Sequence, residues 1–230
     1  MSEIILLSDV RLSFPHIAEP QKNVNEQTGA TRVSYNCEFI MPKDHPGFAA
    51  FMKRYGELAL QKWAEHAQTV MTMISKDRKT RCFGEGDEKV NKKTFKPYDG
   101  YAGNLFITAG RDQPPQIIEA NGTPIDPNNT MAYQMLTRKM YGGCRVNAAV
   151  KPWVQANSYG NGIRCDLVAL QFLRDDTAFG EGAADASGMF GSVTGGAAAM
   201  QAGVPGFAPY EQSPNMPAAP FGGLPSFLGQ

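Results

Sequence analysis

Basic and aromatic residues alternate through the segment "KDRKTRCFGEGDEKVNKKTFKPYDGYAGN", residues 76–104. The segment has no long apolar run, so it cannot bury itself and should face solvent or a partner. Cations that contact phosphates and rings that stack on bases can hold a single nucleic-acid strand without reading its sequence. The alternative is a solvated loop in which Tyr98 and Tyr101 pack on the rim of the body. The candidate contacts are Lys76, Arg78, Lys79, Arg81, Lys89, Lys92, Lys93, Phe95, Lys96, Tyr98 and Tyr101.

A second candidate surface lies further along the chain, in "CRVNAAVKPWV" and the turn that follows it. Small apolar residues alternate there with polar ones, so one side of the strand should face the core and the other should face outward. The outward set is Arg145, Lys151 and Trp153. Trp153 is either a stacking platform or a lid on the core, and Tyr159, at the hairpin tip, is harder to bury and is the better ring.

The formal net charge of zero conceals two unlike parts. All 22 lysines and arginines lie in residues 1–174, which carry a formal charge of +5, whereas residues 175–230 carry five acids and no base. A basic body with an acidic tail indicates a nucleic-acid partner. The tail is rich in Gly, Ala and Pro and shows no sustained period, so we expect a folded domain at 1–174 and a disordered tail at 175–230.

The sequence lacks the residues that several classes of protein require. His16, His45 and His66 are dispersed, no cysteine pair has zinc-ligand spacing, and no phosphate-binding loop or nucleophile motif is present. We therefore expect no catalytic residue, no metal and no cofactor, and four isolated, reduced cysteines. No apolar run is long enough for a membrane helix, and residues 4–7 are too short for a secretory signal, so a cytoplasmic location is expected.

The order of predicted elements indicates the fold class. Alternation predicts strands at 10–14 and 33–41, an amphipathic helix at 45–70 with Asp44 as its N-cap, and a strand at 104–110. A short helix at 130–141 and a hairpin of two strands follow. A mainly β, OB-fold-like barrel of five strands fits this order, with the long helix between strands two and three and the short helix between strands three and four. An antiparallel sandwich or another small barrel has the same strand count.

Three blocks of the sequence resemble a family of bacteriophage single-stranded DNA-binding proteins: "VRLSFPHIAEP", "YNCEFIMPKDHP" and "YGGCRVNAAVKPWV…GNGIRCDLVALQFLRDD". The resemblance spans residues 4–175 in order. It implies an OB-fold, sequence-independent binding of single-stranded DNA in phage replication or recombination, and a tail that modulates binding or recruits replication proteins. Members commonly end in a strongly acidic tail, whereas this chain has no acid after Glu211.

Other functions remain open on the sequence alone. A phage structural or assembly protein with a β-rich body and a flexible tail would share much of the composition. A nuclease would require metal-dependent cleavage of the strand. A homo-oligomer is compatible with the sequence, and the tail can equally be a linker.

Overall fold

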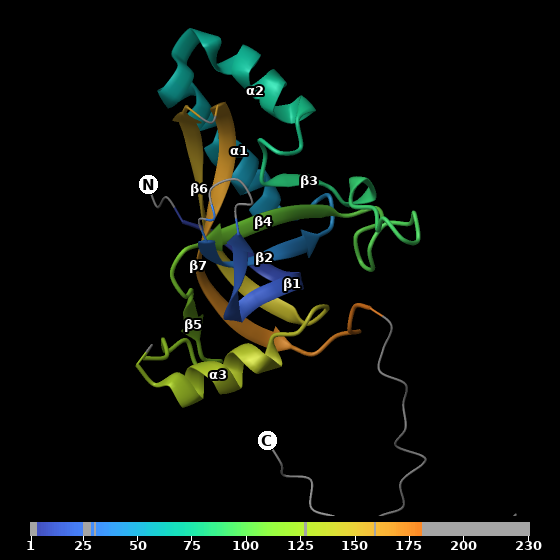
Figure 1. The fold of residues 1–230 in the computed structure, drawn as a ribbon, viewed down its shortest axis with the longest axis vertical. Coiled ribbons are helices and arrows are strands. Elements are labelled where there is room, and N and C mark those ends of the chain that lie inside the picture. Colours follow the sequence, from blue (N-terminus) through green and yellow to red (C-terminus); the bar gives the residue numbers. More distant parts are fainter. Residues whose placement is uncertain (1–3, 25–28, 30, 127, 159, 181–230) are drawn as a thin grey trace, which may run out of the picture. The chain divides into compact units, whose positions relative to one another are not determined.

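The computed structural model describes residues 4–24, 29, 31–126, 128–158 and 160–180 (Figure 1). Their strands form one sheet in the order β3-β4-β2-β1-β6-β7-β5. All neighbouring strands are antiparallel except β5 and β7, which are parallel. The strands are β1 (Ile5–Val24), β2 (Thr31–Met41), β3 (Phe83–Glu85), β4 (Leu105–Arg111), β5 (Gln116–Ile118), β6 (Arg145–Asn157) and β7 (Gly160–Arg174).

The mainly β class with helices inserted between strands is confirmed, whereas the strand count is higher than five. The two additional strands, β3 and β5, have three residues each and are too short to show alternation, although the two isoleucines at 117 and 118 already suggest a short strand where β5 lies. They form the two edges of a seven-stranded sheet, and no ladder among the described residues joins these edges. The bent sheet is therefore not closed by hydrogen bonds among these residues.

β1 is bent, and its two halves pair with different strands. Its first half pairs with β6 and its second half with β2, with register shifts between Leu7 and Val10 and between Ser13 and His16. Asp9 and Phe14 adopt positive φ values of 53° and 45° near these shifts, a conformation that residues with a Cβ rarely adopt. Such irregularities bend a strand and redirect its side chains.

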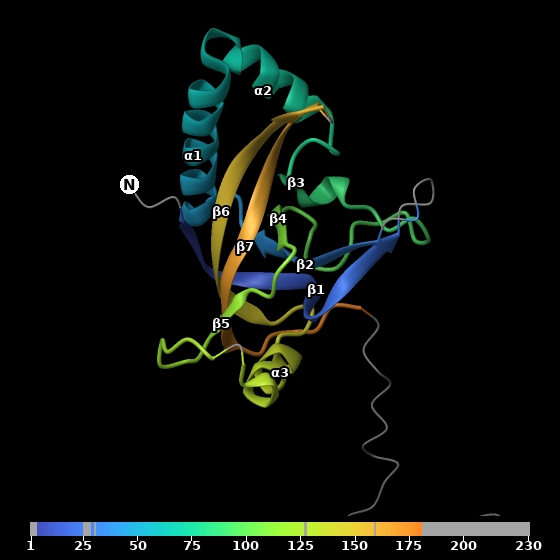
Figure 2. The same cartoon turned by 60° about the vertical axis from the view of Figure 1, so that its left-hand side comes forward.

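The helical insertion between β2 and β3 consists of α1 (Pro46–Trp63), the 3-10 turn η1 (Ala64–His66) and α2 (Ala67–Lys76). Figure 2 shows α1 alongside β6, and α2 near the far end of the β6–β7 hairpin. The N-cap of α1 is His45 and not Asp44, because Nδ1 of His45 accepts from the Gly47 amide at 3.1 Å and its Nε2 lies 2.8 Å from the Ser8 carbonyl oxygen. α3 (Thr130–Lys139) lies at the opposite end of the body.

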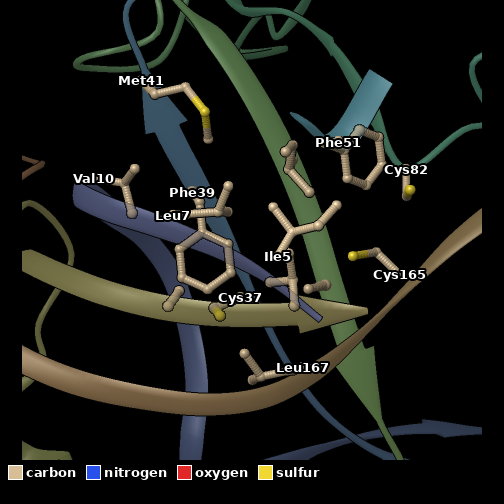
Figure 3. Packing of buried hydrophobic residues seen from close by; sticks show 14 of the residues in the cluster. Ile5, Leu7, Val10, Cys37, Phe39, Met41, Phe51, Cys82, Cys165 and Leu167 are labelled. Carbon is tan, nitrogen blue, oxygen red and sulfur yellow. The ribbon is translucent and has the colours of Figure 1, made fainter. Parts of the chain in front are cut away.

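The core lies on the inner face of the sheet and beneath α1. The inward residues of β2 and the first strand residues of β1 meet Phe51 of α1 (Figure 3). Tyr55 and Ala59 continue the buried stripe of α1, as its aromatic periodicity predicts. Within the described residues no helix is both long and apolar enough to cross a membrane. The four cysteines, Cys37, Cys82, Cys144 and Cys165, are free and buried.

Candidate nucleic-acid interface

A groove opens on the outer face of the sheet, over β2 and β4. Because Cys37, Phe39 and Met41 of β2 are buried in the core, the even-numbered residues of this strand point outward. The floor includes Ser34 and Asn36 of β2 and Thr108 and Gly110 of β4. The groove has a volume of about 320 Å³, and its lining is Arg32, Ser34, Asn36, Arg81, Cys82, Thr108, Ala109, Gly110, Trp153, Arg164 and Cys165.

One backbone hydrogen bond joins the two walls of the groove. The amide of Ile163, on β7, donates to the carbonyl oxygen of Thr80 at 2.8 Å. Gly162 permits this approach, because a Cβ there would lie 2.7 Å from the same oxygen. The contact holds the segment after α2 against the β6–β7 hairpin, and this brings Arg81 and Arg164 to one groove.

The three arginines of the groove differ in the groups that hold their side chains. Arg164 is oriented by Gln155, at 3.1 Å from its Nε, and by the carbonyl oxygen of Lys79, at 2.9 Å. Arg81 is mostly buried and pairs with Glu88 at 2.6 Å. Arg32 is exposed and pairs with Asp112 at 3.3 Å. Arg164 is the arginine that neutral groups orient, so its charge is the one most available to a phosphate.

Trp153 supplies a ring at the edge of the groove. It pairs with Arg164 across the hairpin, and its indole N–H donates to Asp166 at 2.7 Å. The residue is 39% exposed. Because its polar edge is held and part of its surface is open, the ring is oriented as a platform on which a base can stack.

The Cys165 thiol adds no negative charge to the groove. Cys82 and Cys165 line it, and both are buried. Burial and the neighbouring Cys82 hold the pKa of the Cys165 thiol well above its usual value. The charged side chains of the groove lining are therefore cationic. Among the described residues no cluster of three or more His, Cys, Asp or Glu residues could hold a metal ion.

The residues predicted from the sequence fall in several places. Arg81 and Trp153 line the groove, and Lys79 contributes a carbonyl oxygen to Arg164. Lys76 and Arg78 are exposed beside this wall, and Arg78 donates to the Glu88 carbonyl at 2.6 Å. Lys151 is half-buried on β6, two residues from Trp153, and Tyr159 lies outside the described residues.

Arg145 does not reach the groove. Its Nε donates to Asp176 at 2.7 Å, and its guanidinium also donates to the Asp9 carbonyl at 2.9 Å. The outward orientation expected from alternation is correct, but the side chain is engaged in an intramolecular ion pair at the start of β6. The expectation that Arg145 contacts DNA is therefore not supported by its position.

Residues 86–104 form a loop that covers the other end of the outer face of β2. We call it the aromatic loop. Its tip carries Lys92, Lys93 and Lys96, all exposed, and Phe95, which is 82% exposed. Tyr98 is half-buried and meets Phe14 edge to face, with ring centres 5.2 Å apart. The tip therefore offers cations and rings, as the sequence predicts, although it does not line the groove.

Tyr101 corrects the sequence-based assignment. It is fully buried, and its hydroxyl donates to the Glu38 carboxylate. Burial and the adjacent Glu38 raise the pKa of Tyr101 above its usual value. Its ring packs with Ile40 and Phe106, so it cannot stack on a base and instead anchors the aromatic loop. The alternative of a tyrosine packed on the body is correct for this residue.

Arg32, Arg164 and Phe14 were missed by sequence reasoning. Arg164 alternates with the buried Ile163 and Cys165, so the period of two already indicated an outward cation. Phe14 is 42% exposed because its positive φ turns it out of the strand's alternation, and no local sequence signal shows this.

The first six residues assigned to the tail pack on the body. We call residues 175–180 the strap. Asp176 pairs with Arg145 at 2.7 Å and with Arg11 at 3.6 Å, and the hydrogen bond from Arg145 holds the pKa of Asp176 below its usual value. The Phe179 amide donates to the Gly142 carbonyl at 2.8 Å. Residues 175–180 thus contact the body, whereas the disorder expected for 181–230 concerns residues outside those that the structure describes.

Comparisons with known proteins agree with this fold. A family model described as the ssDNA-binding protein of Enterobacter phage Enc34 matches residues 3–199. Putative protein p50 of Acyrthosiphon pisum secondary endosymbiont phage 1 is 29% identical over 177 residues, covering 76% of this chain and 85% of the relative.

Two solved structures of the single-stranded DNA-binding protein from bacteriophage Enc34 are also similar. One is 25% identical with a TM-score of 0.56 and covers 81% of this chain and 89% of the other. The second, a complex with ssDNA, is 24% identical with a TM-score of 0.58 and covers 78% of this chain and 90% of the other. Because the family match extends over most of the chain, this protein belongs to the phage single-stranded DNA-binding protein family typified by that of phage Enc34.

Proposed function

We propose that this protein binds single-stranded DNA, with little preference for base sequence, through the groove over β2 and β4. The observation that carries the proposal is the placement of Arg164, Arg81 and Trp153 around one groove on the outer face of the sheet. Membership of a family of single-stranded DNA-binding proteins supports it, as does the similarity in fold to a relative solved with ssDNA.

The chemistry of the groove suits a flexible strand. Arg164 contacts a phosphate, and Trp153 stacks on a base, an interaction that contributes about 1–3 kcal/mol. On the floor, Asn36 and Thr108 offer oxygen acceptors and the Ser34 hydroxyl can donate or accept, so these groups can hydrogen-bond to the edges of different bases. Stacked bases in a duplex cannot reach the ring, so single strands should be preferred.

The tip of the aromatic loop extends the binding surface in this proposal. Lys92, Lys93 and Lys96 form no ion pair among the described residues and contact backbone phosphates beyond one end of the groove. Lys76, Arg78 and Lys79 do the same beside the opposite wall. Phe95 and Tyr98 provide rings for sequence-tolerant stacking.

The protein acts in this view during phage DNA replication or recombination, in the host cytoplasm, where single strands arise. The acids beyond the strap, Glu181, Asp185 and Glu211, make the tail a weak competitor for the basic surface or a segment for replication partners. A chain ending at Gly180 tests the first role, because it should bind single strands more tightly at low salt and equally at high salt.

Fluorescence anisotropy with labelled single-stranded and double-stranded oligonucleotides of one sequence, at two salt concentrations, tests the function. We expect the single strand to bind more tightly and both affinities to fall with salt. Equal affinity for the two forms would contradict the stacking mechanism. No binding to either form would favour the structural or assembly role, and metal-dependent cleavage would indicate a nuclease.

A further inference from the structure

A carboxylate lies in the middle of the proposed DNA-binding face. Glu38 is on β2, two residues from Asn36, and points to the same outer side of the sheet. It is 8% exposed. An acid in this place would repel phosphate, and a buried carboxylate is costly unless it is paired and hydrogen-bonded. Its presence on this face therefore needs an explanation from its surroundings.

Three donors, two from the aromatic loop and one from β4, satisfy Glu38. One carboxylate oxygen forms an ion pair with the ammonium of Lys89 and also accepts from the Thr108 hydroxyl at 3.3 Å. The other accepts from the Tyr101 hydroxyl. Lys89 and Tyr101 lie at the two ends of the aromatic loop, whereas Thr108 belongs to β4. Glu38 thus ties both ends of the loop to the sheet.

Lys89 is largely enclosed, although less completely than its partner. Its ammonium faces the rings of Phe14 at 5.5 Å, Phe106 at 5.3 Å and Tyr101 at 6.0 Å. Its side chain is 21% exposed. A cation between a carboxylate and three aromatic rings is already neutralised, so approach of a phosphate would have to compete with Glu38 at close range.

The rest of the aromatic loop is closed around these two residues. The amide of Tyr98 donates to the Lys89 carbonyl at 3.0 Å, and the Gly86 amide donates to the Asn104 carbonyl at 2.7 Å. Gly86 is packed so tightly that a Cβ there would lie 1.9 Å from the Tyr101 carbonyl oxygen. The loop is therefore a preformed unit, and a shift of Lys89 would move its base.

We infer that Glu38 is a positioning residue that neutralises Lys89 and fixes the aromatic loop at one end of the groove, so that Lys89 contributes no charge to DNA binding. The inference rests on the proposed function and deepens it. It separates Lys89 from the neighbouring Lys92, Lys93 and Lys96, which the sequence places in the same cluster. The loop then meets DNA with its tip, while its base serves as scaffold.

The dependence of affinity on salt tests this assignment, because each lysine that contacts a phosphate of a single strand contributes about 0.7 to the slope of log K against log salt. The measurement uses the full chain and a labelled oligothymidylate. Lys92→Gln should lower the slope by about 0.7, whereas the double change Lys89→Gln/Glu38→Gln, which removes the neutral ion pair as a unit, should leave it at the wild-type value. Glu38→Gln should steepen the slope, by up to about 0.7, because Lys89 loses its counter-charge.

Glu85→Gln is the matched control. It makes the same change of charge, but Glu85 forms an exposed pair with Lys43 at 2.8 Å outside the groove lining, so the slope should not change. A purely structural role for Glu38 would lower affinity without steepening the slope.

Each result decides one point. A slope that falls as much in Lys89→Gln/Glu38→Gln as in Lys92→Gln would overturn the inference, and so would an unchanged slope in Glu38→Gln. If Glu38→Gln alone does not fold, the double variant still decides, because its two neutral amides can hydrogen-bond to each other in place of the ion pair. Failure of the wild-type protein to bind any single strand would overturn the proposed function, and the inference with it.

Discussion

The guanidinium of Arg11 lies over the ring of Phe179, 4.2 Å from its centre, and fastens the strap to the body. Phe179 also packs against the cluster of Ile40, Tyr101 and Phe106, next to the base of the aromatic loop. The first residues after β7 are thus part of the fold.

The strap should contribute to stability. A chain ending at Arg174 loses Asp176 and Phe179, and we expect a lower midpoint of thermal unfolding than for a chain ending at Gly180. Phe179→Ala should cost about 2 kcal/mol, less than the loss of a fully buried phenylalanine. Circular dichroism melts of the two truncated chains and the point variant check this. Equal midpoints for the two truncated chains would mean that the strap only rests on the surface.

Acid should weaken the attachment of the strap. Because Arg145 lowers the pKa of Asp176, the ionised carboxylate is favoured in the folded state. Its contribution to stability is complete above the ordinary aspartate pKa of about 4 and is lost as the pH falls through the lowered value. The melting midpoint of Asp176→Asn should therefore lie below that of the wild type at pH 6, and the difference should shrink as the pH falls below the ordinary aspartate pKa of about 4. A constant difference over this range would contradict the ion pair as its cause.

Arg164 should carry part of the electrostatic affinity. Arg164→Gln removes the charge that Gln155 and the Lys79 carbonyl orient, so single-strand affinity should fall and the salt slope should decrease by about 0.7. Arg138→Gln is the control, because Arg138 is exposed on the last turn of α3, away from the groove. Anisotropy titrations at several salt concentrations measure both. An equal change in the two variants would show that only net charge matters.

Trp153 should act through its ring. Trp153→Ala should weaken single-strand binding by about 1–3 kcal/mol with little change in the salt slope, and Trp153→Phe should restore part of the loss. Because the residue is 39% exposed, the fold should tolerate both changes. Binding titrations and melts of the two variants check this. A large drop in melting midpoint with unchanged affinity would instead make Trp153 a lid on the core.

Substitutions of Tyr101 and Tyr98 should have different effects on stability and DNA affinity. Tyr101→Phe leaves a carboxylate oxygen of Glu38 without its hydroxyl donor and should cost about 1–3 kcal/mol of stability. Tyr98→Ala should cost less stability and more affinity, because Tyr98 is only half-buried. Chemical denaturation and anisotropy titrations of both variants separate the two effects. A stability loss confined to Tyr98→Ala would reverse the assignment.

The period of two predicted the long strands, and the period of the apolar residues predicted α1, because both patterns reflect burial on one face. β3 and β5 were too short to show a period. Arg145 was correctly placed outside the core, but its engagement depends on Asp9 and Asp176, which are distant in sequence. The burial of Tyr101 depends on Glu38, 63 positions away. Local patterns can tell which side a residue faces, but they do not identify its partner.

The contact between Ile163 and Thr80 has a consequence for how the groove moves. The wall that carries Arg81 belongs to the insertion, and the wall that carries Arg164 belongs to the hairpin, so one amide spans the seam between them. That proton can exchange with solvent only when the seam parts. The hydrogen-exchange rate of the Ile163 amide therefore reports how often the two walls separate. A bound DNA strand that contacts both walls should slow exchange at this amide more than at its neighbours on β7.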